Sequence, residues 1–183
     1  MKYLLALLTS IFASILLTAC GSGDGFTNPV VIDPGGQTVR LDFPTEYGLQ
    51  IPTSGNRVTV ASNNTVTFVT MAGTNNILNI EPNVLVRSME VSGSNNTVNL
   101  SNNDTVPTIS VLGTNAILNV GADDQINEIQ MLGSNGLLTI TSFSANVGTI
   151  GLGGSNIVLR IPTGYTSKTT IHNTGANNQI IEQ

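Results

Sequence analysis

The residues best suited to chemistry by type and spacing are three aspartates, Asp104, Asp123 and Asp124. Asp104 and Asp124 lie 20 residues apart, which equals the period of a repeat that runs through most of the chain. We therefore expect them at the same turn of neighbouring repeats, about 5 Å apart, a separation that suits a cation or the acid pair of a glycosidase. The repeats on either side carry Val84 and Ala145 at this position, and no Arg or Lys shares it. Two interpretations stay open: a weak cation or glycan site, or solvated turn acids.

Other residue types offer less chemistry. His172 is the only histidine and Cys20 the only cysteine, so zinc binding and Ser-His-Asp catalysis lack partner residues. The run Gly151-x-Gly153-Gly154 lacks the lysine of a phosphate-binding loop and falls on the repeat. We therefore expect no catalytic residue, no metal and no cofactor.

The first 19 residues predict an export signal. Lys2 supplies a positive start, and the apolar run from Leu4 to Leu17 is too short and too early for a dependable membrane-spanning helix. The segment ends in Leu17-Thr18-Ala19-Cys20, which resembles the bacterial lipobox, in which the Cys thiol takes a diacylglyceryl group and becomes the first residue after cleavage. The chain's only cysteine occupies this position. Residues 1–19 are thus predicted to be a lipoprotein signal peptide and Cys20 the lipidated residue; the alternative is a chance cysteine after an ordinary signal.

A lipidated Cys20 would fix the protein to a membrane, since each buried acyl methylene contributes about 0.8 kcal/mol. Ser22 follows the anchor where an Asp would be a retention signal, so the resemblance to Gram-negative lipoproteins implies the outer membrane. Whether the domain faces the periplasm or the outside stays open. With Lys+Arg at 6 against Asp+Glu at 11, no clustered basic surface is available for nucleic acid.

The positioning elements are predicted by the phrase Ser92-Gly93-Ser94-Asn95-Asn96-Thr97-Val98-Asn99-Leu100, which recurs along the chain. Its glycine returns at positions 73, 93, 113 and 133, a constant spacing of 20 residues, with looser copies at 154 and 175. A fixed period of this size is typical of a solenoid, in which each repeat buries its apolar face against its neighbours. Aromatic residues make up only 4% of the chain, which fits a narrow aliphatic core.

Apolar residues recur at three registers of the repeat. They lie four and two residues before the glycine, five and seven after it, and seven before it, as in Ile109 and Val111, Leu118 and Val120, and Val106. Alternation of this kind predicts short strands, so each coil has three sides around one core. We predict an all-β fold, a single-stranded parallel β-helix of about seven coils of about 20 residues, right-handed because no six-residue sub-period is present.

The repeat also predicts a turn in each coil between the two strands that flank Gly-Ser/Thr-Asn. Glycine is expected to supply the positive φ of this turn. The asparagines that follow are expected to stack as a structural ladder; they are Asn75, Asn95, Asn115, Asn135, Asn156 and Asn177. A column of outward apolar residues, Ile77, Ile117, Leu137 and Val158, is either a contact stripe for a partner or a surface covered by the N-terminal segment.

Around the repeats we expect a flexible tether at residues 20–36, a cap strand at 37–48 and the β-helix domain at 49–183. The tether is rich in Gly, Asp and Pro, although the run Val30-Val31-Ile32 could pack on the first coil instead. The last coil has no evident cap, so self-association through coil ends is a further hypothesis.

From about Thr53 to Ile181, the Gly-Ser-Asn-Asn-Thr-Val repeats behind a lipoprotein-type signal resemble a bacterial secreted β-helix family of unknown function with Gly-x-Asn-x-Val repeats. The resemblance implies the fold and no activity. The leading functional hypothesis is a non-catalytic cell-envelope lipoprotein that serves as a rigid scaffold or binding module for protein or glycan. The alternative is a carbohydrate-active enzyme or a cation-dependent glycan-binding protein that uses Asp104 and Asp124.

Overall fold

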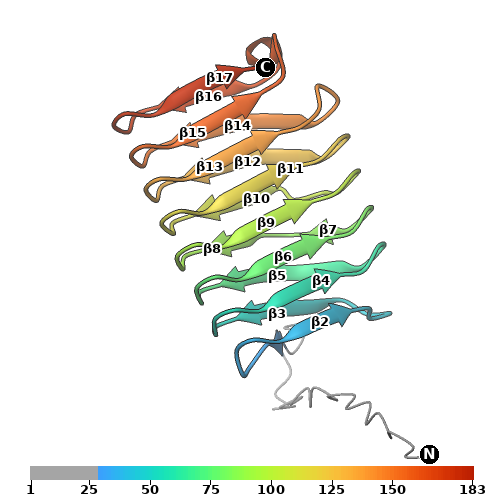
Figure 1. The fold of residues 1–183 in the computed structure, drawn as a ribbon. Coiled ribbons are helices and arrows are strands. Elements are labelled where there is room, and N and C mark those ends of the chain that lie inside the picture. Colours follow the sequence, from blue (N-terminus) through green and yellow to red (C-terminus); the bar gives the residue numbers. More distant parts are fainter. Residues whose placement is uncertain (1–28) are drawn as a thin grey trace, which may run out of the picture.

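The computed structural model describes residues 29–183, which form one parallel β-solenoid (Figure 1). The predicted signal peptide, Cys20 and most of the predicted tether lie outside these residues. In most strands, residues alternate between buried and accessible positions, as in the sequence Ile77-Leu78-Asn79-Ile80, where Leu78 and Ile80 are buried. The alternation follows from the pleat of a strand, which sends successive side chains to opposite faces.

The strands form two parallel sheets on opposite sides of the core. One sheet contains β1 (Pro29–Val31), β3 (Tyr47–Ile51), β5 (Thr65–Met71), β8 (Met89–Val91), β10 (Thr108–Val111), β12 (Gln125–Met131), β14 (Asn146–Leu152) and β16 (Thr170–Asn173), with the short β7 (Leu85–Val86) beside β5. We call it sheet A. Sheet B contains β2 (Thr38–Leu41), β4 (Arg57–Val60), β6 (Ile77–Ile80), β9 (Thr97–Leu100), β11 (Ile117–Val120), β13 (Leu137–Ile140), β15 (Val158–Ile161) and β17 (Gln179–Glu182).

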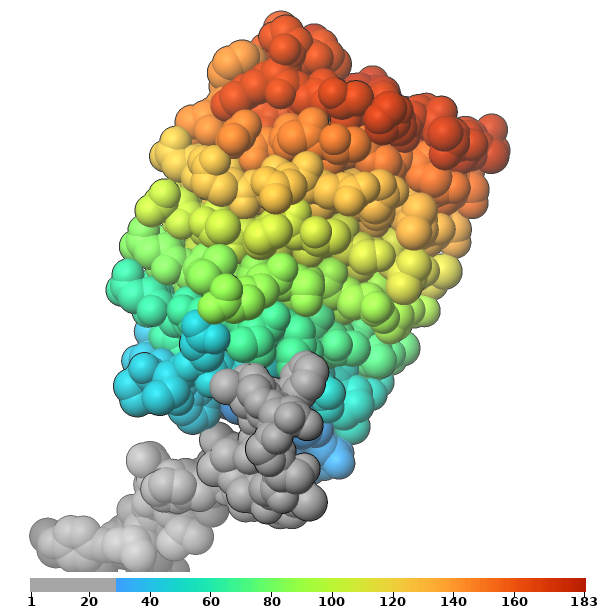
Figure 2. Space-filling model, turned by 180° about the vertical axis from the view of Figure 1, so that it is seen from behind, coloured from blue at the N-terminus to red at the C-terminus, as the bar shows by residue number. Residues whose placement is uncertain are grey.

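The predicted β-helix is confirmed, with about 8 turns of about 20 residues where about seven coils were expected. Equivalent residues of successive coils pair directly, so Leu118 is aligned with Leu138 and Ile109 with Ile129. Val98, Leu118 and Leu138 stack within one core and are at most 2% exposed. Figure 2 shows the coils as successive bands along the rod.

The third predicted register is buried but does not form a third sheet of its own. Its members are buried and lie near the beginning of the sheet A side of each coil; they are Val66, Val86, Val106, Ile126 and Val147. In β5, β12 and β14 this register and the following one belong to a single strand of seven residues. Only one coil divides them into two strands, β7 and β8.

The extra coil lies at the N-terminal end. β1 pairs with β3, and Val30 and Ile32 are buried at 4% exposure, so this part of the predicted tether belongs to the rod. β2, within the expected cap strand, pairs with β4 in register and is the first strand of sheet B. Residues 29–48 therefore continue the solenoid rather than forming a separate cap.

The last coil differs from the others at one corner. A short 3-10 helix, η1 (Tyr165–Ser167), replaces the usual turn, and the Tyr165 side chain is fully buried with its hydroxyl donating to the carbonyl oxygen of Ala145 at 2.9 Å. Lys168 donates from Nζ to the carbonyl oxygens of Phe143 and Ala145, at 2.9 and 2.8 Å. This insertion closes the side of the last two coils.

Candidate functional site

Asp104 and Asp124 lie at the corner that leads from sheet B back to sheet A, and both side chains are fully buried. Asp104 accepts from the backbone N–H of Val84 at 2.9 Å with one carboxylate oxygen, and from that of Ser101 at 3.0 Å with the other. Each oxygen therefore satisfies an amide of the turn, one in the preceding coil and one in its own.

Asp124 repeats this arrangement one coil further on. Its carboxylate accepts from the N–H of Asp104 at 2.8 Å and from the N–H of Gly121 at 2.8 Å. Asp123 is exposed and holds a left-handed backbone conformation, with φ at 60°. Of the three predicted acids, the structure thus stacks two inside the corner and leaves the third outside.

Burial governs the electrostatics of this pair. It is the main reason that the pKa of Asp104 is raised to about 7; the neighbouring Asp124 adds to this rise, and the amide partners of Asp104 oppose it. Burial likewise raises the pKa of Asp124 to about 6. The interpretation of these two residues as solvated turn acids is wrong, because the turn folds around them.

The geometry also bears on the cation or glycan site. A ligand that approaches from solvent meets Asp123 but neither buried carboxylate, whose oxygens already bind backbone amides. Within residues 29–183 there is no group of three or more His, Cys, Asp or Glu side chains that could hold a metal ion. The buried pair is therefore suited to capping the turn, and the enzymatic alternative gains no accessible acid pair from it.

The opposite corner, between sheets A and B, contains the predicted asparagine ladder. Asn95 donates to Asn75 at 3.1 Å, and Asn115 donates to Asn95 at 2.9 Å. Asn156 donates to Asn135 at 3.2 Å, and Asn177 holds the same left-handed conformation as the others. These side chains are exposed.

The positive φ of this corner belongs to the asparagines, with values of 53° to 56°, and not to the repeat glycines as expected. The glycines are needed for close approach instead. A Cβ atom on Gly93 would lie 1.8 Å from the carbonyl oxygen of Gly73, a distance at which no side chain fits. Successive coils therefore touch backbone to backbone at this column.

A second amide row, which the sequence analysis missed, lies buried behind the ladder. Asn76 donates its backbone N–H to Oδ1 of Asn96 at 2.9 Å, and Asn96 donates from Nδ2 to the carbonyl oxygen of Gly73 at 2.8 Å. Asn56 and Asn76 repeat the pattern one coil earlier. The two corners thus use related devices. In both corners a buried side chain accepts from a backbone N–H of the preceding coil. The asparagine also donates to a backbone carbonyl oxygen, whereas the aspartate accepts from a second backbone N–H.

The outer face of sheet B carries a third amide row. Asn119 donates to Asn99, and Asn99 donates to Asn79, both at 2.8 Å. The predicted apolar column runs beside it and is half-buried; it contains Ile77, Ile117, Leu137 and Val158. The sequence also allowed this column to be covered by the N-terminal segment. That expectation concerns residues before Pro29, which lie outside the described part of the chain.

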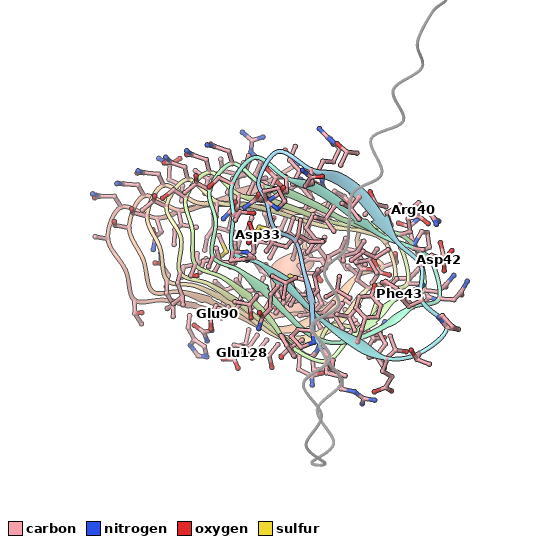
Figure 3. The ribbon with its side chains drawn as sticks, turned by 90° about the horizontal axis from the view of Figure 1, so that it is seen from below. Asp33, Arg40, Asp42, Phe43, Glu90 and Glu128 are labelled. Carbon is pink, nitrogen blue, oxygen red and sulfur yellow. The ribbon has the colours of Figure 1, made fainter. Side chains whose placement is uncertain are left out.

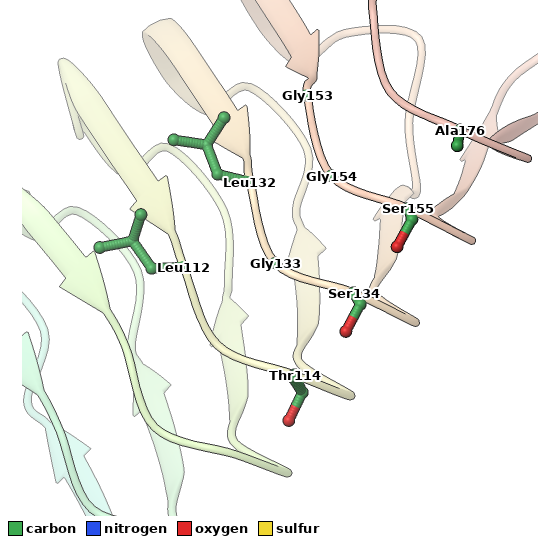
Figure 4. Close-up of a pocket in the computed structure, with 9 residues that line it drawn as sticks. All are labelled: Leu112, Thr114, Leu132, Gly133, Ser134, Gly153, Gly154, Ser155 and Ala176. Atoms are coloured by element: carbon green, nitrogen blue, oxygen red, sulfur yellow. The ribbon is translucent and has the colours of Figure 1, made fainter.

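An open groove follows the corner between the sheets in the C-terminal half of the rod (Figure 4). The groove is open to solvent, and its lining comes from four successive coils, from Leu112 to Ala176. Leu112 and Leu132 form its apolar wall and are 44% and 46% exposed. Hydroxyl groups form its other side; they belong to Thr114, Ser134 and Ser155.

The groove results from an irregular column in the repeat. The residues directly before the repeat glycine are small in the earlier coils, Ala72 and Ser92, and become Leu112 and Leu132 further on. The column then returns to a small residue, Gly153, where a Cβ atom would meet Leu132 at 2.8 Å. Two leucines in successive coils, followed by a glycine in the next, therefore produce a step in the surface. This change from leucine to glycine in one column is the feature of the sequence from which the groove could have been predicted.

The remaining candidate, His172, is exposed on β16 in the last coil. Along residues 29–183 no helix is long and apolar enough to cross a membrane.

Comparison with models of protein families, with curated proteins and with solved structures finds no match to this chain.

Proposed function

We propose that this chain is a non-catalytic lipoprotein of the bacterial cell envelope whose rigid β-solenoid binds a protein or glycan partner. The observation that carries the proposal is the groove beside Leu112 and Leu132. Two adjacent leucines remain exposed there, on a backbone that parallel pairing fixes in both sheets. Contiguous apolar surface at a fixed place in a folded chain is typical of a contact surface.

The chemistry of the described residues supports binding over catalysis. The only acids stacked in register, Asp104 and Asp124, are buried and bonded to backbone amides. General acid-base catalysis requires a carboxyl group that reaches the substrate. A scaffold requires only a surface of constant shape, which the repeated pairing of coils supplies.

The two walls of the groove favour different partners. The exposed leucines favour a protein, because apolar side chains of a partner would bury them. The hydroxyl row favours a glycan as the second candidate, because it presents donors and acceptors at the spacing of the coils. One member of this row, Thr114, already donates to the hydroxyl of Ser94 in the preceding coil, at 2.9 Å.

The lipid anchor at Cys20 completes the proposal. Eight residues lie between Cys20 and Pro29, the first residue of β1, so the connection reaches at most about 30 Å. The N-terminal coil would then stay close to the outer membrane. The groove and the last coil would face away from it.

Binding is tested with the double variant Leu112→Ser and Leu132→Ser in the full chain. Leu85→Ser, in β7, is the matched control because its leucine is half-buried away from both the groove and the apolar column of sheet B. Cross-linking in intact cells, together with binding to a panel of glycans, should show a partner that the double variant loses and the control keeps. Equal partner recovery by all three chains would refute the groove as the binding surface.

Anchoring is tested separately with Cys20→Ser. Mass spectrometry of the mature N-terminus should find a diacylglyceryl group on Cys20 of the native chain. The variant should leave the membrane fraction or retain residues 1–19. A native chain without lipid that floats with membranes just as the variant does would contradict the anchor and leave the groove hypothesis intact.

A further inference from the structure

The C-terminal end of the rod leaves its core open. Leu138 and Leu159 occupy one inward column and are fully buried, whereas Ile180, the next member of that column, is 42% exposed. Ile181 beside it is 38% exposed. Within residues 29–183 these side chains of the core type are thus left uncovered, and covering them would remove apolar surface from water.

Both sheets also end there in unpaired strands. β16 pairs only with β14, and β17 pairs only with β15. The outer edge of each strand thus presents a row of backbone N–H and C=O groups at the same end of the rod. Such edges are templates for pairing with another strand.

The N-terminal end of the rod is protected by comparison. Its inward residues Val30 and Leu41 are 4% and 1% exposed, and Val39 between them is half-buried. Pro29 has no backbone N–H to offer to a partner strand. Arg40 lies at the rim between Asp42 and Glu81, with N–O distances of 3.3 and 2.8 Å, and Figure 3 shows Arg40 and Asp42 at that edge. This end is therefore a poor partner for the open end of another copy.

We infer that two copies of this chain join through their C-terminal ends, with β16 and β17 of each copy at the interface. Each coil runs along one sheet and returns along the other, so β16 and β17 run in opposite directions. A two-fold axis across the end of the rod therefore sets both edges against antiparallel strands of the second copy at once. Such an interface is closed at two copies and covers Ile180 of both.

Charge at this end permits the pairing. The side chains of β16 and β17 include one carboxylate, that of Glu182. It accepts from the N–H of Gly164 at 3.2 Å and from the hydroxyl of Thr166 at 3.1 Å, which holds it toward η1. Lys168 is likewise occupied by carbonyl oxygens. Two copies can therefore meet without rows of like charges facing each other.

The inference stands independently of a partner in the groove and is tested by sedimentation equilibrium on the full chain in detergent. The native chain should have twice the mass of one chain at micromolar concentration. Ile180→Lys should raise the dissociation constant of the pair at least about tenfold, because it places a charge in an apolar interface. Leu85→Lys, at a half-buried leucine of β7 far from the end and from the groove, is the control and should leave the pair intact.

A second variant guards against loss of folding. Ile181→Glu changes an outward side chain at the edge and should also give a single chain, with the far-ultraviolet circular dichroism of the native protein. A native chain that is monomeric at every concentration would overturn the inference and leave the open end to a different protein. A pair that survives both end variants would overturn it too, because the interface would then lie elsewhere.

Discussion

The backbone N–H of Asp104 donates to the carboxylate of Asp124 at 2.8 Å, so the buried Asp124 caps the turn that contains Asp104 in the preceding coil. The carboxylate of Asp104 does the same for Val84. The two acids are therefore structural parts of neighbouring coils, and their removal should weaken the fold before it affects any ligand.

Replacement of Asp124 by Ala should lower the free energy of unfolding. It leaves the amides of Asp104 and Gly121 without acceptors, at about 1–3 kcal/mol for each buried amide that stays unsatisfied. Urea unfolding measures the loss. Asp123→Asn is the matched control and should stay within about 0.5 kcal/mol, since Asn occupies the same left-handed position at residue 103. A stable Asp124→Ala variant that no longer binds a cation or glycan would instead favour the site hypothesis.

Stability should fall as the pH rises through the neutral range. The ordinary pKa of an aspartate is 3.8, and burial raises the pKa of Asp104 to about 7, so the folded chain holds its proton more tightly than the unfolded chain. Between about pH 4 and pH 7 the folded state binds more protons, and the free energy of unfolding decreases with pH. Urea unfolding from pH 5 to pH 8 should show this decrease.

The control for the pH dependence is Glu81→Gln. Arg40 lowers the pKa of Glu81 from its ordinary value of 4.5, so this residue acts below the tested range and the variant should keep the slope. Asp104→Asn should make the decrease smaller and leave the part due to Asp124, whose pKa is raised to about 6. A native chain whose stability is constant or rises from pH 5 to pH 8 would show that the amide partners outweigh burial.

The buried amide of Asn96 should matter more than the exposed amide of Asn95. Asn96→Ala removes a donor from the carbonyl oxygen of Gly73 and an acceptor from the N–H of Asn76, and should cost about 1–3 kcal/mol for each buried group left without a partner. Asn95→Gly keeps the left-handed backbone, as Gly55 does in an earlier coil, and should cost only a few tenths of a kcal/mol. Thermal unfolding of the two variants should therefore rank them in this order; the reverse order would contradict the role of the buried row.

The repeat glycines should tolerate no side chain where coils touch. Gly93→Ala places a Cβ atom 1.8 Å from a backbone oxygen, so successive coils must separate and the loss should exceed about 3 kcal/mol. Gly153→Ala meets only the end of the Leu132 side chain, at 2.8 Å, which can rotate away. Expression and circular dichroism should show a folded Gly153 variant beside a destabilised Gly93 variant. Similar stability of both would indicate a looser stack than the structure has.

The constant period made most of the fold predictable. Once glycines recur every 20 residues, Val98, Leu118 and Leu138 must take equivalent places, and the inward registers follow. The period predicted the N-terminal end of the rod less well. Pro34, Gly35 and Gly36 resemble a linker, although the strands on either side of them pair with the following coil.

The polar corners were harder to predict because turns in most proteins are solvated. The signal was present in the columns themselves. The position of Asp104 and Asp124 is taken by Val84 and Ala145 in neighbouring coils, and a site that accepts both Val and Asp is a buried one. The column of Asn96 likewise continues with Ala116, Gly136 and Ile157. The apolar residues in these columns indicate that the position is buried, not that a ligand site has been lost.

The two extremities of the rod are chemically unlike, which gives the molecule a polarity along its length. The eight strands of sheet B have seven spacings of about 4.8 Å and extend over roughly 34 Å. Under the proposed function, a single copy attached through Cys20 stands upright with its open end outermost. In the proposed pair the two N-terminal coils lie at opposite tips, roughly 70 Å apart. Pairing would therefore either lay the joined rods flat along one bilayer or let them bridge two facing bilayers.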